Sequence, residues 1–84
     1  MEKSANSQTR EKARAIVAGV LTGIVPVEKI TDTAQFIDLG VDSLDKIEVM
    51  FALEEHFHID ISDDAIEGLK TVGDMLSYVE RATA

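Results

Sequence analysis

The sequence contains no cysteine and no tryptophan, and it has only one proline, one tyrosine and three phenylalanines among its 84 residues. Without cysteine the chain can form neither disulfides nor a thiolate metal site, and its two histidines belong to no clustered set of metal ligands. The hydrophobic core must therefore hold the fold alone. A chain of this length buries roughly 60% of its unfolded surface. The lack of cysteine is also typical of a reducing compartment.

Long apolar runs are missing as well. No segment approaches the roughly 20 consecutive apolar residues of a membrane span. The N-terminal stretch MEKSANSQTREK is polar and has no apolar segment of the kind found in secretory signals. We therefore expect a soluble, cytoplasmic protein, with the monomer as the default oligomeric state.

Basic residues are scarce. Eight Lys and Arg stand against sixteen Asp and Glu, which gives a formal net charge of −8 at pH 7. Phosphate backbones are bound by Lys/Arg surfaces, so a nucleic-acid partner is not expected. An acidic field instead steers encounters with basic patches on other proteins, and salt weakens this attraction.

The first half of the chain is predicted to hold one helix and one long loop. Residues 1–8 are expected to form a flexible N-terminal tail, and residues 9–84 a single domain. Apolar residues at three- and four-residue spacing predict a helix from Thr9, which Gly23 is placed to end. Residues 23–40 show no sustained period and predict a long loop with a short turn near residues 27–30. A loop this long in a small domain is often functional.

Three further helices are each preceded by a residue that can cap them. No β-branched alternation persists long enough to predict a strand. The predicted fold is all-α, a four-helix bundle with a long loop after the first helix and a short third helix. The caps are Asp42 before residues 43–57, Ser62 before residues 63–69 and Thr71 before the last helix.

The predicted helix over residues 43–57 has two differently composed faces. At about 100° per residue, one apolar stripe about 120° wide forms the core side. A second arc is acidic and is bordered by the apolar residues Leu44 and Phe51. Apolar anchors ringed by charge are typical of a docking surface, but a solvated acidic face remains an equal alternative. The core stripe contains Ile47, Met50, Leu53 and Phe57, and the acidic arc contains Asp45, Glu48 and Glu55.

Ser43 stands at the start of this helix with no base nearby. The histidines, His56 and His58, lie thirteen and fifteen residues further along the same predicted helix. At about 1.5 Å rise per residue they are roughly 20 Å away, beyond the hydrogen-bond reach of a general base. No G-x-S-x-G motif surrounds the serine. Ser43 is therefore either a helix-start residue or the target of another enzyme.

Three stretches resemble the acyl carrier protein family. They are DLGVDSLD at residues 38–45, IEVMFALEEHF at residues 47–57 and ISDDAIEGLKTVGDMLSYV at residues 61–79. The similarity extends from about residue 16 to residue 79 and is densest over residues 36–57. It includes the family's Asp-Ser-Leu attachment motif as Asp42, Ser43 and Leu44.

The resemblance implies that Ser43 receives 4′-phosphopantetheine from coenzyme A through a phosphodiester, transferred by a separate magnesium-dependent holo-carrier synthase. The thiol of this arm then carries acyl groups as thioesters between enzymes of fatty-acid, specialised lipid or polyketide synthesis. Asp42 helps to position the synthase. The chain is expected to be no enzyme itself but the substrate of a phosphopantetheinyl transferase, with no metal site of its own.

By the same resemblance, carboxylates of the helix after the serine meet Lys and Arg of partner enzymes. Exposed ion pairs contribute little each, so weak, fast and salt-sensitive contacts are expected. The implied recognition residues are Leu44, Asp45, Glu48, Phe51, Glu54 and Glu55.

In this family some core residues can part to admit the acyl chain. Here their alternative role is ordinary core packing, which holds for most of them in any case. The implied pocket residues are Phe36, Met50, Leu53, Phe57, Ile61, Ile66, Leu69 and Val72.

Several residues depart from the family pattern. Lys46 stands where a small neutral residue is usual, and its helical phase places it near the pocket mouth. There it either contacts the phosphate or extends its ammonium to solvent. His56 and His58 replace familiar acids near the helix C-terminus, where a capping role is expected. These changes indicate a dedicated pathway rather than the housekeeping one.

Two other functions remain open at this point. One is a carrier of aminoacyl or other non-fatty groups, although Asp42 and Glu48 favour acyl groups. The other is an unmodified acidic helical module that binds basic protein surfaces, which a phosphopantetheinyl transferase would not modify. An EF-hand calcium site is excluded, because neither Asp38 nor Asp60 starts its alternating ligand pattern.

Overall fold

The computed structural model describes residues 2–83 of the chain, and the side chains of residues 8–83. This part contains four α-helices, one 3₁₀ helix and no β-strand. The predicted all-α four-helix fold, with its long loop and short third helix, is confirmed. The elements are α1 (Glu2–Val20), η1 (Val27–Lys29), α2 (Ser43–Phe57), α3 (Asp63–Gly68) and α4 (Val72–Thr83).

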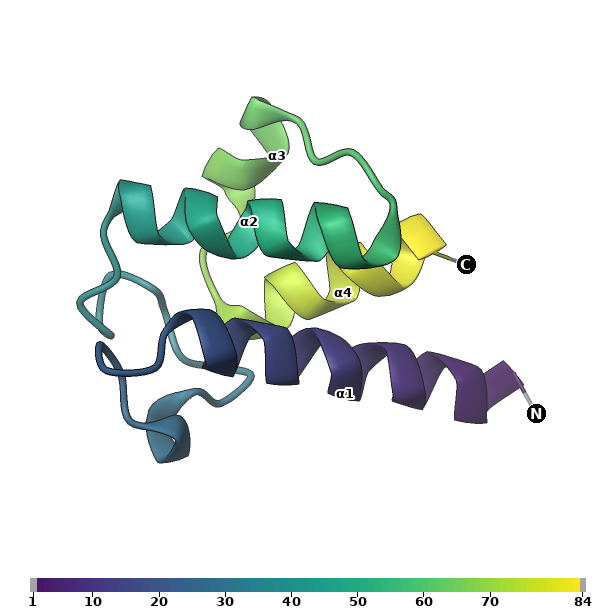
Figure 1. The fold of residues 1–84 in the computed structure, drawn as a ribbon, viewed down its shortest axis with the longest axis horizontal. Helices are drawn as coiled ribbons and strands as arrows, with labels where there is room; N and C mark the ends of the chain where they lie inside the picture. Colours follow the sequence, from purple (N-terminus) through teal and green to yellow (C-terminus); the bar gives the residue numbers. More distant parts are fainter. Residues whose placement is uncertain (1, 84) are drawn as a thin grey trace.

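Three of the helices pack together as the body of the bundle. α1 packs against both α2 and α4 and runs in the opposite direction to them (Figure 1). The short α3 lies on the other side of α2 from α1 in this view. Both termini therefore lie at one end of the bundle, whereas the long loop and the start of α2 lie at the opposite end.

The three predicted caps are present. The hydroxyl of Ser62 accepts a hydrogen bond from the N–H of Ala65 at 3.1 Å and starts α3. Thr71 and Asp74 bond each other reciprocally: the Thr71 hydroxyl accepts from the Asp74 N–H at 3.0 Å, and the Asp74 carboxylate accepts from the Thr71 N–H at 3.2 Å. Asp42 caps α2 in the same way as Ser62 caps α3. Side-chain oxygens thus satisfy backbone donors that a helix start leaves free.

α1 begins at Glu2, whereas the sequence predicted a start at Thr9. The residues between them include neither proline nor glycine, so nothing interrupts the helix once its later turns are packed. The prediction relied on apolar periodicity, which starts only where the helix reaches the core. The flexibility expected of residues 1–8 stays a prediction, and Met1 lies outside the described residues.

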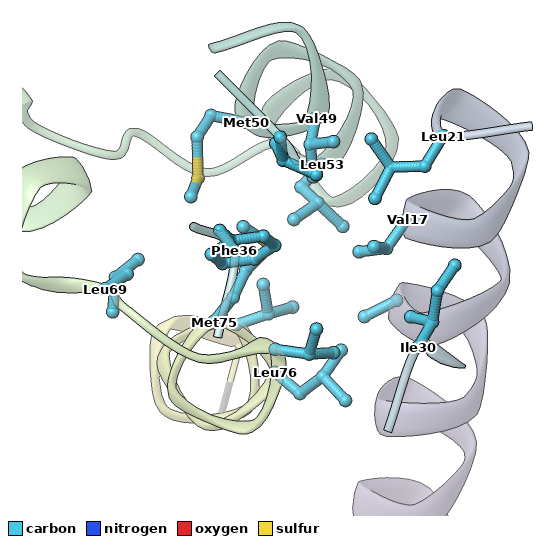
Figure 2. Packing of buried hydrophobic residues seen from close by; sticks show 14 of the residues in the cluster. Val17, Leu21, Ile30, Phe36, Val49, Met50, Leu53, Leu69, Met75 and Leu76 are labelled. Carbon is cyan, nitrogen blue, oxygen red and sulfur yellow. The ribbon is translucent and has the colours of Figure 1, made fainter. Parts of the chain in front are cut away.

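Phe36 from the long loop lies in the middle of the hydrophobic core (Figure 2). Its side chain is 3% exposed and lies between Met50 and Leu53 of α2 and Met75 of α4. α1 closes the core on another side with Val17. Burying an aromatic ring removes about 150–250 Å² from water, so the loop is held by the same hydrophobic stabilisation as the helices.

The core face of α2 is rotated from the predicted stripe. Val49 is fully buried together with Met50 and Leu53, whereas Ile47, predicted to lie in the core, is 36% exposed. Phe57 is half-buried against the core. The reason is tertiary, because the core shared with α1 and α4 covers one sector of α2. Periodicity alone does not distinguish neighbouring apolar rows on a helix.

The second half of the long loop is bonded to the segment that precedes α4. The Phe36 N–H donates to the Lys70 carbonyl at 3.0 Å, and the Val72 N–H donates to the Ala34 carbonyl at 3.0 Å. These two bonds form an isolated antiparallel bridge rather than a strand pair. They supply partners for backbone groups that would otherwise be buried without one.

Asp32 ties the same loop to both α4 and α1. Its carbonyl accepts from the Gly73 N–H at 2.8 Å. Its carboxylate forms ion pairs with the guanidinium groups of Arg10, at 2.9 Å, and of Arg14. Arg10 also forms an ion pair with Glu80 of α4 at 2.6 Å. The hydrogen bond from Arg10, followed by that from Arg14, holds the pKa of Asp32 below its ordinary value of 3.8.

The close approach at Gly73 predicts that Gly73→Ala destabilises the fold. A Cβ at this position would lie 2.7 Å from the Asp32 carbonyl oxygen, so the loop or α4 must shift. We expect a loss of about 1–3 kcal/mol in the free energy of unfolding, measured by urea titration. Gly19→Ala in α1 is the matched control, because its Cβ would meet nothing within 4 Å. That control should be neutral or stabilising by up to about 1 kcal/mol, and equal effects of both variants would contradict the argument.

The ion pairs of Asp32 predict an acid-sensitive contribution to stability. Because the folded-state pKa of Asp32 is lowered, the stabilisation is fully present above pH 3.8 and is lost as the pH falls through the folded-state value. Asp32→Asn should therefore reduce stability near neutral pH, by about 1 kcal/mol or less because solvent screens the pair, and less at strongly acidic pH. Unfolding midpoints of the native protein and of Asp32→Asn, measured from neutral to strongly acidic pH, test this prediction. A constant deficit at every pH would contradict it.

Candidate functional site

The chain that leads into α2 is held so that Ser43 falls at a fixed place. Val41 is buried, and its N–H donates to the Phe36 carbonyl at 3.1 Å, which closes the intervening turn. Gly40 within this turn has a φ of 76°, a conformation that glycine adopts without strain. The core position of Phe36 therefore determines where Ser43 emerges from the loop.

Ser43 is the first residue of α2, and its side chain is exposed. The preceding residue provides the cap, since the Asp42 carboxylate accepts from the Asp45 N–H at 2.9 Å. The Ser43 hydroxyl itself makes no hydrogen bond within the described part of the chain. It lies near the positive end of the helix dipole, which favours an attached anion. Ser43 is thus available for chemistry, and Asp42 carries the structural role.

A hollow of about 570 Å³ opens beside Ser43. Its apolar lining comes from Phe36, Ile37 and Val41. Its charged lining comes from Lys46, Lys70, Asp42 and Glu67. The Lys46 ammonium lies 5.6 Å from the centre of the Phe36 ring, within the range of a cation–π contact. Lys70 was not among the site residues expected from the sequence, because no local pattern connects it with residue 43.

Lys46 lies in an unfavourable place for a positive charge. Burial is the largest cause that lowers the pKa of Lys46 from its ordinary value of 10.5, and repulsion from Lys70 lowers it further. Glu67 of α3 opposes this shift in part. Lys46 borders the hollow beside Ser43, and the role of this hollow as the mouth of an acyl pocket stays a prediction.

The exposed face of α2 carries three apolar side chains in one stripe. Leu44 is 72% and Phe51 is 62% exposed, and Ile47 lies between them. The sequence assigned Ile47 to the core, so this third residue was missed, although its spacing of three and four residues from the others was readable. The predicted acids Glu48 and Glu55 are exposed as well, and Asp45 is partly so. Their role in partner recognition stays a prediction.

Glu54 differs from the other predicted recognition acids. Its carboxylate accepts a hydrogen bond from the Ile61 N–H at 2.7 Å, which ties the connection after α2 back to the helix. Glu54 therefore has a structural role that the sequence did not indicate. These two residues are seven positions apart in the sequence, and only the fold of the segment after α2 brings them into contact.

The two histidines lie at the C-terminal end of α2. His58 is the C-cap residue, with a φ of 57°, and its N–H donates to the Glu54 carbonyl. His56 contacts the ring of Phe57 edge to face, with centroids 4.8 Å apart. The predicted position at the helix end is confirmed, and the capping bond comes from the backbone of His58. Within the described residues, no three His, Asp or Glu side chains are grouped to hold a metal ion.

The residues expected to form an acyl pocket divide into two groups. Phe36 lines the hollow beside Ser43, and Ile66 lines a neighbouring hollow of about 370 Å³ that Ser43 and Lys46 also border. The other six belong to the packed core or its edge. A pocket role for any of them requires side chains to part, and it stays a prediction. The six are Met50, Leu53, Phe57, Ile61, Leu69 and Val72.

The bond from Glu54 predicts different effects of two adjacent charge removals. Glu54→Ala leaves the Ile61 N–H without its carboxylate acceptor and should lower the free energy of unfolding by about 1–2 kcal/mol. Glu55→Ala removes the same charge from an exposed position and should change stability by less than about 0.5 kcal/mol. Chemical unfolding of both variants tests the difference. Equal stability would mean that the Glu54 bond contributes nothing.

No helix among residues 2–83 combines the length and apolarity needed to cross a bilayer. A family model described as the phosphopantetheine attachment site matches residues 11–79, which span α2, both hollows and most of the core. Proteins of this family carry a covalently attached 4′-phosphopantetheine group. The exposed Ser43 hydroxyl, with open space and two lysines beside it, fits such an attachment. The chain belongs to this family of phosphopantetheine carrier proteins, which confirms the resemblance to acyl carrier proteins.

Proposed function

We propose that Ser43 is the attachment point of 4′-phosphopantetheine and that the chain carries acyl groups as thioesters between enzymes of fatty-acid, specialised lipid or polyketide synthesis. The observation that supports this best is the exposed Ser43 hydroxyl, unbonded within the described residues, at the start of α2 in a chain of the phosphopantetheine family. When bound, the group supplies a long arm that ends in a thiol and holds the acyl group.

Ser43 needs no base from its own chain, because the phosphopantetheinyl transferase supplies the activation. The Ser43 hydroxyl gives up its proton to the transferase and forms the phosphodiester, while coenzyme A loses adenosine bisphosphate. Asp42 keeps the first turn of α2 in place through its bond to the Asp45 N–H. The serine is thus presented from a rigid helix end rather than from a mobile loop.

The exposed face of α2 is proposed as the docking surface for the transferase and for acyl-transferring enzymes. The apolar stripe of Leu44, Ile47 and Phe51 offers anchors that become buried on contact. Asp45, Glu48 and Glu55 around it attract Lys and Arg of a partner. Exposed charges give fast but weak contacts, which suits a carrier that must leave one enzyme for the next.

Incubation of the protein with coenzyme A, magnesium and a broad-specificity phosphopantetheinyl transferase tests the attachment point. Intact mass should rise by about 340 Da on the native chain. Ser43→Ala should show no gain. Ser62→Ala is the matched control, because Ser62 is also an exposed serine at a helix start but caps α3; it should gain the same mass as the native chain.

Each other outcome has a defined meaning. A folded native chain that gains no mass would overturn the carrier proposal and favour an unmodified acidic module that binds basic surfaces. A gain on Ser43→Ala would move the attachment point elsewhere. Circular dichroism of every variant excludes unfolding as the cause of a missing gain.

A further inference from the structure

We propose that Lys46, with Lys70 across the hollow, binds the phosphodiester that joins 4′-phosphopantetheine to Ser43, and thereby directs the base of the arm over Phe36. The proposal rests on Ser43 being the attachment point. It concerns Lys46, which is half-buried beside Ser43, and the exposed Lys70 near it.

The first observation is an unpaired pair of cations. Only eight of the 84 residues are Lys or Arg, and Arg10 and Arg14 are used in ion pairs with acids. Lys46 and Lys70 instead line one hollow together, and within the described residues neither ammonium forms an ion pair. The exposed Lys12, Lys29 and Arg81 form no ion pair within the described residues either, but Lys46 is half-buried, so an anion beside Ser43 would stabilise its charge.

The second observation is where these cations lie. Lys46 is three residues after Ser43 on α2, so the two side chains are neighbours on one helix face. Ser43 and Lys46 border both hollows at this end of the bundle. A phosphodiester on the Ser43 oxygen therefore begins within the reach of the long lysine side chain. The start of α2 adds its partial positive charge on the same side.

Acids around the hollow compete only in part. Asp42 directs its carboxylate to the Asp45 N–H at the helix start. Glu67 of α3 borders the hollow and partly stabilises the Lys46 ammonium, and Asp63 borders the neighbouring one. Burial and Lys70 outweigh Glu67, since the pKa of Lys46 remains below its ordinary value. The half-buried Lys46 ammonium thus has no full carboxylate partner, and an added anion beside it would stabilise its charge.

The lining determines what this binding does. Lys46 lies over the Phe36 ring, and Phe36 extends from the hollow into the core. A phosphate held by Lys46 places the first carbon atoms of the arm against this ring rather than in open solvent. Binding would reduce the freedom of the arm near its base and bias it toward the core.

The first test compares the native protein without and with the attached arm. Mass confirms complete loading, and NMR of lysines labelled with ¹³C at Cε measures the Lys46 pKa, with Lys46→Arg used to assign the signal. The Lys46 pKa should be higher in the loaded protein, because a neighbouring anion favours the charged ammonium. An unchanged or lower value in fully loaded protein would overturn the inference while leaving the carrier function intact.

The second test locates the arm. The two methyl groups next to the phosphate should show nuclear Overhauser effects to the Phe36 ring in the loaded native protein. Lys46→Gln should lose them and Lys70→Gln should weaken them, whereas Lys46→Arg retains them. Lys12 is an exposed residue of α1 that does not line the hollow. Lys12→Gln removes the same charge and should not alter the Overhauser effects.

The outcomes separate this inference from the proposed function. Equal Overhauser effects in loaded Lys46→Gln and Lys12→Gln, or none in the native protein, would overturn the role of Lys46. A native chain that takes up no arm would refute the attachment at Ser43 itself. Mass is read before any NMR experiment, so the two failures are distinguishable.

Discussion

The bonding of the long loop to the start of α4 is the constraint on which the rest of the structure depends. Residues between α1 and α2 have little regular structure of their own, and η1 is three residues long. The loop is held instead where Asp32 and Ala34 accept hydrogen bonds from Gly73 and Val72. These bonds leave Phe36 in the centre of the core, and Phe36 in turn positions the turn that ends at Ser43.

The end of the bundle that carries Ser43, the proposed attachment point, combines rigidity with exposure. A side chain offered for modification must be accessible, yet it must return to the same place for every partner enzyme. Asp42 caps α2 and so keeps the helix start in one place. The Ser43 hydroxyl is then left exposed and accessible. Division of these tasks between two adjacent residues explains why a serine at a helix start need not be the cap.

Charge is distributed unevenly over this acidic chain. Exposed acids on α2 surround the apolar stripe of Leu44, Ile47 and Phe51, which suits encounters with basic partners. On the neighbouring side of the same helix, Lys46 faces a partly apolar hollow that Glu67 also borders, and within the described residues it forms no ion pair. One helix therefore carries the acidic face that is proposed for docking and the lysine that is proposed to bind the base of the arm.

Sequence alone determined the helix number, the caps and the family. These depend on local signals: side-chain oxygens at Asp42, Ser62 and Thr71, apolar spacing, and the short motif around Ser43. It did not determine which apolar row of α2 faces the core, because Val49 and Ile47 are distinguished only by how α1 and α4 pack. Likewise, only the tertiary fold brings Lys70 to the hollow beside Ser43 and Glu54 to the Ile61 N–H. Contacts between segments distant in the chain leave no periodic pattern, so their consequences appear only when the chain is folded.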